Sequence, residues 1–267
     1  MCGRIKPVTV HWLAPRRRVT LNSGPAPVKG SALSSNDRFD TRSASAYPAF
    51  PDATVGAGAA VDTRAVFGQT MGLVGLTTGF AAAGAYIGRN LGPGAAMVMW
   101  LLSLGAVFGM SFARRARSGS LGMSLLFATG LLLGMAVGPT MSRVASTSGG
   151  TQIIWEAAGL TGLFIAGFGV AGWATKRDLA PAMRIAFFAL LALIVAGIVA
   201  IFVSIPGFHI IYSIAGLAIF SVFTMFDFQR LRHAGEEHSV FLALSIFLDV
   251  FNVFLLFVNL LGGGGRR

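Results

Sequence analysis

Residues 241–261 read FLALSIFLDVFNVFLLFVNLL, an apolar run long enough to cross a bilayer that nevertheless carries four polar side chains. They share one helical face, with spacings of four, three and seven residues: Ser245, Asp249, Asn252 and Asn259. The stripe extends over about 21 Å, which is most of the hydrocarbon thickness. Because a helix surrounded by lipid could not carry such a stripe, we expect this segment at the centre of a helical bundle.

The rest of the chain shares the apolar character of this segment. Of its 267 residues, 54% are hydrophobic and 12% are charged, and the mean hydropathy is +0.72. A soluble domain of this length needs more charged residues to cover its surface. Seven apolar runs have the length that crosses a bilayer: 65–88, 91–113, 120–141, 151–173, 185–205, 208–228 and 241–261. The sequence predicts an all-α integral membrane protein whose seven-helix transmembrane domain occupies residues 61–267.

Basic residues are unevenly divided between the loops that join the seven runs. With the N-terminus taken as cytoplasmic, the inside loops hold eight: Arg114, Arg115, Arg117, Lys176, Arg177, Arg184, Arg230 and Arg232. The outside loops hold two, Arg89 and Arg143. Eight against two agrees with the positive-inside rule, so we predict a multi-pass protein of the cell membrane with a cytoplasmic N-terminus. Seven full spans would place the basic residues Arg266 and Arg267 outside, against this rule. A re-entrant last segment, with its C-terminus inside, therefore stays an alternative.

Residues 1–60 differ in composition from the transmembrane domain. They hold six of the ten prolines together with many Ser, Ala and Gly residues. Such a segment cannot bury enough apolar surface to order itself, and it lacks the apolar core of a signal peptide. We therefore predict a disordered cytoplasmic tail. Translation from Val28 stays an alternative start.

Several functional classes are excluded by the motifs that the sequence lacks. The net charge of +11 comes without an RNA-recognition or helix-turn-helix pattern, so nucleic acid is not an expected partner. Cys2 is the single cysteine, and the four histidines show no zinc-ligand spacing. No P-loop, dinucleotide-binding fingerprint, HExxH or nucleophile elbow occurs. We expect neither an enzyme, nor a bound cofactor, nor a metal centre.

Small residues recur at helical spacing in three of the runs. The first run has Gly68, Gly72, Gly75 and Gly79; the third has Gly130, Gly134 and Gly138; the fourth has Glu156, Gly159, Gly162, Ala166 and Gly169. Flat faces of this kind allow membrane helices to approach closely. We expect all three faces to be packing surfaces within a compact bundle.

Three acidic residues lie within the membrane-length runs: Glu156, Asp227 and Asp249. A carboxylate in hydrocarbon is costly and usually faces the protein interior or a water-filled path. Asp227 and Asp249 lie on consecutive runs, which suggests a titratable pair. Two such groups close together cannot both ionise cheaply, so we expect them to hold one proton between them. Counted from the helix ends, their depths differ by about 7 Å.

The run from Tyr212 through Asp227 to His233 (YSIAGLAIFSVFTMFDFQRLRH), followed by ALSIFLDVFNVFLLFVNLLG, resembles the C-terminal signature of the transmembrane Bax-inhibitor-motif family in its bacterial form. The resemblance extends upstream to Glu156 in WEAAGLTG and to SFARRARSG at the exit of the second run. It covers about residues 65–263.

This resemblance implies seven helices, with two three-helix layers wrapped around the central seventh. It implies a pH-sensitive calcium leak gated by an aspartate pair, which corresponds to Asp227 and Asp249. An arginine closing the second helix interacts with that pair in the family, and by position it is Arg114, with Arg115 as its neighbour. Family members are also described as stress-protective, and some affect membrane proteases.

Three function classes stay open at this point. The first is a proton-modulated calcium leak channel, with protons, calcium and the bilayer as partners. The second is a non-conducting regulator that binds other membrane proteins, and the third is a proton-coupled transporter. Structural roles also stay open: Asn252 as an interhelical hydrogen-bonding residue, Arg114 as a topology determinant, and Glu156 as either a ligand where ions enter or an interfacial acid.

Overall fold

The computed structural model describes residues 63–116, 118–203, 206–235 and 238–263. The chain divides into two units, Met1–Val55 and Gly56–Arg267, and every described residue belongs to the second. The predicted cytoplasmic tail over residues 1–60 lies outside the described residues.

Seven α-helices make up the described part of the chain, in which no β-strand occurs: α1 (Thr63–Gly88), α2 (Pro93–Arg115), α3 (Gly119–Ala145), α4 (Gly150–Ala174), α5 (Ala180–Phe202), α6 (Phe208–Arg232) and α7 (Ser239–Gly262). Each is long and apolar enough to span a bilayer. The predicted all-α membrane bundle of seven helices is confirmed.

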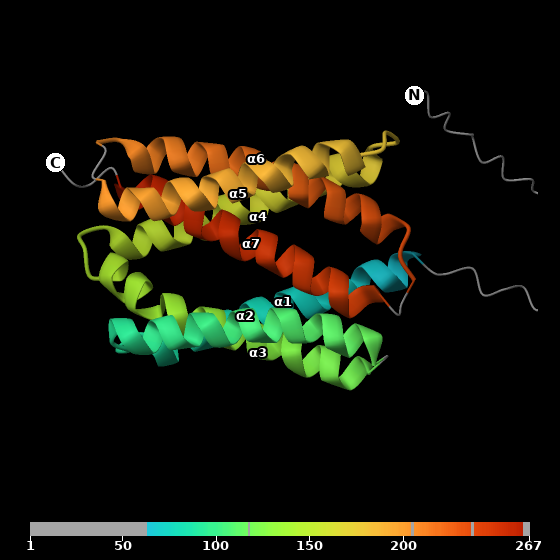
Figure 1. Cartoon of the computed structure of the whole chain (residues 1–267), viewed down its shortest axis with the longest axis horizontal. Coiled ribbons are helices and arrows are strands. Elements are labelled where there is room, and N and C mark those ends of the chain that lie inside the picture. Colours follow the sequence, from blue (N-terminus) through green and yellow to red (C-terminus); the bar gives the residue numbers. More distant parts are fainter. Residues whose placement is uncertain (1–62, 117, 204–205, 236–237, 264–267) are drawn as a thin grey trace, which may run out of the picture. The chain divides into compact units, whose positions relative to one another are not determined.

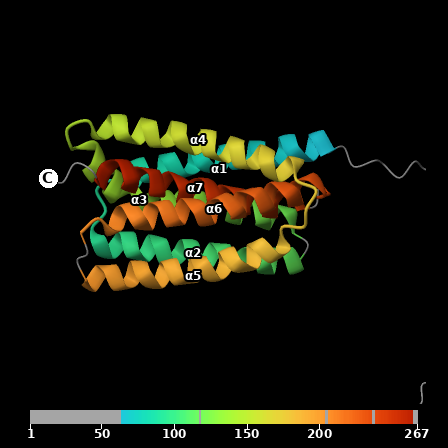
Figure 2. The ribbon, with the colours of Figure 1, turned by 90° about the horizontal axis from the view of Figure 1, so that it is seen from above.

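Two groups of three helices flank α7. In one group α1 and α2 each pack on α3, and in the other α4 and α5 each pack on α6. Helix α7 contacts α6 and α4 from one group and α1 and α3 from the other, and it crosses between them in Figure 1. Figure 2 shows it running along the middle of the bundle. Half of the residues in an 18-residue apolar stretch of α7 are buried, against 11% in the corresponding stretch of α5, so α7 supplies much of the core.

The closest helix contact lies between α1 and α3. A Cβ atom at Gly134 would overlap the carbonyl of Ala81, and one at Gly84 would overlap the carbonyl of Leu131. Gly130 and Gly138 also face α1 backbone. Glycine is required here because the two backbones touch. The predicted packing role of the α3 glycines is confirmed.

The glycine face predicted for α1 is wrong. A Cβ atom at any of its members would meet no atom within 4 Å: Gly68, Gly72, Gly75 and Gly79. Helix α1 instead buries a second series with the same period, which runs from Val66 and Thr70 to Gly84 and Gly88. Both series have helical spacing, so periodicity alone does not choose between them. On α4 the prediction holds only in part: Gly169 meets the Phe228 ring, whereas Gly159 and Gly162 face open space.

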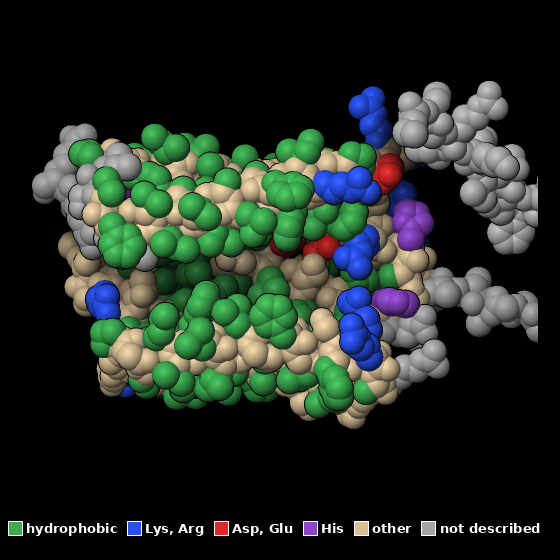
Figure 3. Space-filling view, in the orientation of Figure 1, with side chains coloured by type: hydrophobic (Ala, Val, Ile, Leu, Met, Phe, Trp, Pro, Cys, Tyr) green, Lys and Arg blue, Asp and Glu red, His purple; other side chains and the backbone are tan. Residues whose placement is uncertain are grey.

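Positive charge gathers at one end of the bundle. Figure 3 shows Lys, Arg and His side chains at the end where α2, α4 and α6 finish. Arg114 and Arg115 close α2, and Arg230 and Arg232 lie in the last turn of α6. Arg143 closes α3 at the opposite end. We call these the basic end and the far end.

Helix α7 starts at the basic end and runs unbroken for 24 residues. At about 1.5 Å per residue this length crosses the whole hydrocarbon layer. This length favours a full crossing of the bilayer over the alternative of a re-entrant last segment.

Candidate functional site

Helices α6 and α7 run antiparallel, and their contacts keep one register over most of their length. Near the far end the Asn259 amide donates a hydrogen bond of 3.1 Å to the hydroxyl of Ser213. Two turns further along, Phe220 and Val253 pack in one apolar cluster. Residues further toward the C-terminus of α6 therefore contact residues further toward the N-terminus of α7. This register determines where the polar residues of the two helices meet.

At the basic half of the interface the register brings two carboxyl–hydroxyl contacts together. Ser245 of α7 contacts the Asp227 carboxyl, and Thr224 of α6 contacts the Asp249 carboxyl. The two carboxyl groups are close enough to interact electrostatically. Because Asp227 faces Ser245, one turn before Asp249, the aspartates are offset by four residues, or about 6 Å along the helix axis. The depth difference predicted from the sequence therefore persists as a staggered pair.

Both aspartates lie inside the protein. Asp227 is 2% exposed and Asp249 is 4% exposed. Within the described part of the chain, the Oδ2 atom of each and the Oγ1 atom of Thr224 lack a well-formed hydrogen bond. Buried polar atoms are normally satisfied, so each exception calls for an explanation such as a proton, an ion or a water path. The site thus has acceptor oxygens that the surrounding protein does not use.

Arg230 is the cation nearest to the pair, and sequence reasoning missed it. Its Nη1 lies 3.8 Å from Oδ1 of Asp227, one turn away on α6, and its side chain is half exposed. The i, i+3 spacing was the signal that could have identified this contact. Arg114 lies elsewhere in this arrangement: its guanidinium stacks 4.5 Å above the ring of Phe241 on α7. No ion pair joins Arg114 to either aspartate within the described ranges.

The other predicted residues of the α7 stripe differ in their roles. Ser245 belongs to the site through its contact with Asp227. Asn252 donates to the carbonyl of Leu248 at 2.7 Å, so its amide bonds its own helix and not a neighbouring one. Asn259 makes the interhelical bond that was expected of Asn252.

Glu156 is separate from the aspartate pair. It lies in the second turn of α4, toward the far end of the bundle, whereas Asp227 lies near the basic end of α6. Its side chain is exposed and accepts a 2.7 Å hydrogen bond from Gln152 one turn before it. In the described ranges, no three His, Cys, Asp or Glu side chains gather where they could hold a metal ion.

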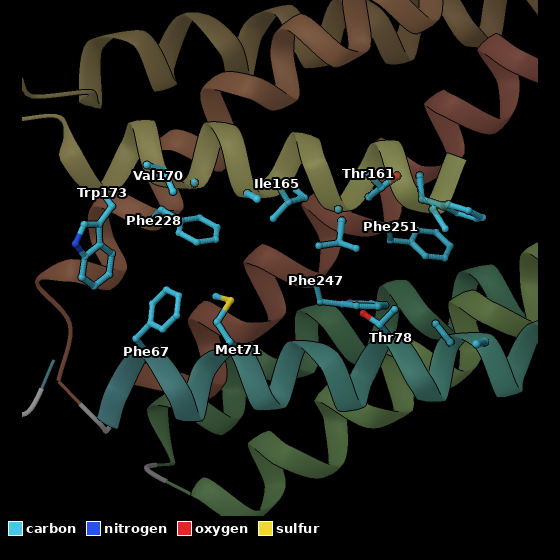
Figure 4. A pocket seen from close by; sticks show the side chains of 18 of the residues that line it. Phe67, Met71, Thr78, Thr161, Ile165, Val170, Trp173, Phe228, Phe247 and Phe251 are labelled. Atoms are coloured by element: carbon cyan, nitrogen blue, oxygen red, sulfur yellow. The ribbon is translucent and has the colours of Figure 1, made fainter. Parts of the chain in front are cut away.

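A large apolar groove lies beside the site without including it. Its volume is 1170 Å³, and α1, α4 and α7 form its walls (Figure 4). Phe247 and Phe251 line it from α7, while Phe67 and Trp173 face each other near its basic end. Neither aspartate lines the groove. Helix α7 therefore presents apolar side chains to the groove and its carboxylate to α6.

Comparison with known proteins gives one family and several bacterial relatives. Residues 63–266 match the family described as inhibitor of apoptosis-promoting Bax1. An uncharacterized membrane protein of Vibrio cholerae is 29% identical over 204 residues, which cover 76% of this chain and 91% of that protein. An uncharacterized protein of Helicobacter pylori is 28% identical over 165 residues, which cover 62% of this chain and 70% of that protein. An uncharacterized protein of Campylobacter jejuni is 24% identical over 206 residues, which cover 74% of this chain and 88% of that protein.

Proposed function

The chain belongs to the Bax inhibitor family, and on that basis we propose that it is a pH-sensitive calcium leak channel of the cell membrane. Its gate is the staggered pair of Asp227 and Asp249. The observation that carries this proposal is the burial of two neighbouring carboxyl groups, each with an oxygen that lacks a well-formed hydrogen bond. Calcium prefers oxygen ligands, and carboxyl groups buried inside a membrane protein mark ion or proton pathways.

The described arrangement corresponds to a closed gate. Since the aspartates are 2% and 4% exposed, an ion in water cannot reach them without movement of the helices. Ionised Asp227 attracts Arg230, which stands at the basic end of the pair. Protonation weakens that attraction and also removes the mutual repulsion of the two carboxylates. The balance between two packings of α6 and α7 therefore depends on pH, with a midpoint that belongs to the pair.

Orientation follows from the charge distribution. We place the basic end in the cytoplasm, since cytoplasmic loops carry the excess of Lys and Arg. The N-terminus of α1 lies at that end, so the proposal places Thr63 on the cytoplasmic side. The proposal assigns no chemical reaction to the chain, and its partners are calcium, protons and lipid.

Calcium flux into liposomes containing the purified full chain, measured across pH, tests the proposal. Asp249→Asn imitates permanent protonation at one site and Asp227→Asn at the other. Each change should flatten the pH dependence of flux, and the double variant should add little to either single one, because the two groups act as a unit. Glu156→Gln is the matched control, since it changes an exposed acid far from the pair and should leave the profile intact. Wild-type pH profiles in both Asn variants would make the aspartates structural.

The alternative is a stress-protective, non-conducting regulator that binds other membrane proteins, such as a membrane protease. One observation favours it: the small-residue face of α1 (Gly68, Gly72, Gly75 and Gly79) is open, with no atom within 4 Å of any ideal Cβ position. Such faces are suited to close approach by another membrane helix. Purified protein that conducts no calcium at any pH would favour this role over the channel.

A further inference from the structure

A second, polar pocket opens at the basic end of the bundle. Its volume is 760 Å³, and its walls come from the end of α2, the α4–α5 connection, the end of α6 and the start of α7. Five basic side chains line it: Arg114, Lys176, Arg177, Arg230 and Arg232. We call it the basic pocket. Charges from three separate parts of the sequence thus converge on one concavity.

The basic pocket has little negative charge of its own. Asp178 is the one acid among the described lining residues, and its Oδ1 atom already accepts a 2.9 Å hydrogen bond from the backbone of Ala180 at the start of α5. His233 and His238 also line the pocket. Like charges in a concave site focus the field and attract anions.

Three of the five cations are held in place by the fold. Arg232 donates to the carbonyl of Trp173 at 2.7 Å, Arg114 stacks on Phe241, and Arg230 reaches Asp227. Lys176 and Arg177 lie on the short α4–α5 connection and are exposed. The pocket therefore combines a preorganised set of guanidinium groups with two side chains that are free to close on a ligand.

We propose that the basic pocket binds a phosphorylated anion carrying two or more negative charges, supplied by the head group of an anionic phospholipid. Guanidinium groups recognise phosphate through paired hydrogen bonds. The pocket lies where the transmembrane helices end, which is the level of the lipid phosphates in a bilayer. Basic pockets between transmembrane helices on the cytoplasmic side bind cardiolipin head groups. Phe241 and Leu242 add an apolar wall from α7, suited to the part of the lipid next to the head group.

A topology signal alone does not require this arrangement. The positive-inside rule counts Lys and Arg residues in loops and does not depend on whether they face one another. Here the cations surround a cavity, and one of them also contacts an aspartate of the gate. The proposal goes beyond the leak channel and holds whether or not the protein conducts calcium.

Lipid binding to the full chain purified in detergent tests the proposal. Native mass spectrometry measures the binding of cardiolipin and of phosphatidylglycerol at equal phosphate concentration. Inorganic pyrophosphate is measured in the same way as a soluble ligand without lipid chains. The double variant Lys176→Ala/Arg177→Ala should bind cardiolipin about 30-fold more weakly, since each basic residue contributes about a factor of five. Arg89→Ala/Arg143→Ala, which removes two exposed cations at the far end, should bind as the wild type does.

The outcomes separate the source of the anion from the existence of the site. If pyrophosphate binds more tightly than cardiolipin, and Lys176→Ala/Arg177→Ala abolishes that binding, the phosphate site stands and the lipid source is refuted. The proposal is overturned if the two double variants lose cardiolipin affinity equally, or if neither loses any. Because Lys176 and Arg177 lie outside the aspartate pair, calcium flux of their double variant in cardiolipin-free liposomes should equal that of the wild type. Failure of the lipid site is therefore distinguishable from failure of the channel.

Discussion

Replacement of Gly134 by Ala should destabilise the bundle more than any other single methyl addition to the α1–α3 interface. The new Cβ atom would lie 2.8 Å from the carbonyl carbon and 2.9 Å from the Cα of Ala81, and it would overlap the carbonyl oxygen. Carbon atoms pack best at about 3.5–4.0 Å, so the carbon contacts alone require the two helices to separate by roughly 0.7 Å, and the overlapping carbonyl oxygen requires more. The obstacle is backbone, which cannot rotate away as a side chain can.

The cost follows from that separation. Overpacking of a tight core costs about 1–3 kcal/mol, and the upper value applies here because neighbouring contacts at Gly130 and Gly138 loosen at the same time. A loss of about 3 kcal/mol lowers the ratio of folded to unfolded protein roughly 100-fold. Unfolding in mixed micelles with increasing dodecyl sulfate, followed by tryptophan fluorescence, measures this change.

Gly75→Ala provides the matched control. It makes the same substitution on the same pair of helices, but its Cβ atom meets nothing within 4 Å. Its free energy of unfolding should equal that of the wild type or exceed it by up to about 1 kcal/mol, because alanine favours the helix more than glycine does. Equal unfolding curves for Gly134→Ala and Gly75→Ala would refute the close α1–α3 contact.

Three further predictions concern register, orientation and the gate. In a Cys2-free background, Ser213→Cys with Asn259→Cys should form a disulfide on oxidation, detected by mass spectrometry, because these side chains are hydrogen-bonded at 3.1 Å; failure to cross-link would contradict the α6–α7 register. A cysteine at Arg177 should resist labelling by an impermeant reagent outside intact cells, and efficient labelling would invert the topology. Arg230→Ala should raise resting calcium leak more than Arg114→Ala, since Arg230 is the residue 3.8 Å from Asp227; the reverse order in a flux assay would return the gating role to Arg114.

Hydropathy predicted the number of helices and most of their positions, because the bilayer determines the length of an apolar run. It placed some ends too early or too late. Helix α6 starts at residue 208 as predicted but continues to Arg232, and α5 starts at Ala180, five residues before its apolar run. Hydropathy detects the part of a helix that lies in hydrocarbon, whereas the backbone continues helically into the polar interface.

The aspartate pair was predictable as two acids on consecutive segments, and the count from the helix ends predicted a difference in depth, but the contacts that set the stagger were not predictable. The offset depends on how α6 and α7 slide past each other, and that is set by packing along the whole interface, as at Phe220 and Val253. The approach of Arg230 to Asp227 was readable from spacing, while the stacking of Arg114 on Phe241 requires the relative placement of α2 and α7.

Helix α7, which contacts both three-helix groups, comes after the other six described helices along the chain. Synthesis runs from the N-terminus, so α1 to α6 enter the membrane before α7 leaves the ribosome. Until it arrives, Thr224 and Asp227 on α6 have no α7 partner and must be shielded by lipid head groups, water or an insertion chaperone. Ribosomes that stop before Ser239 would release six spans with this polar face uncovered, a clear target for membrane quality control. Arrival of α7 thus covers this polar face of α6.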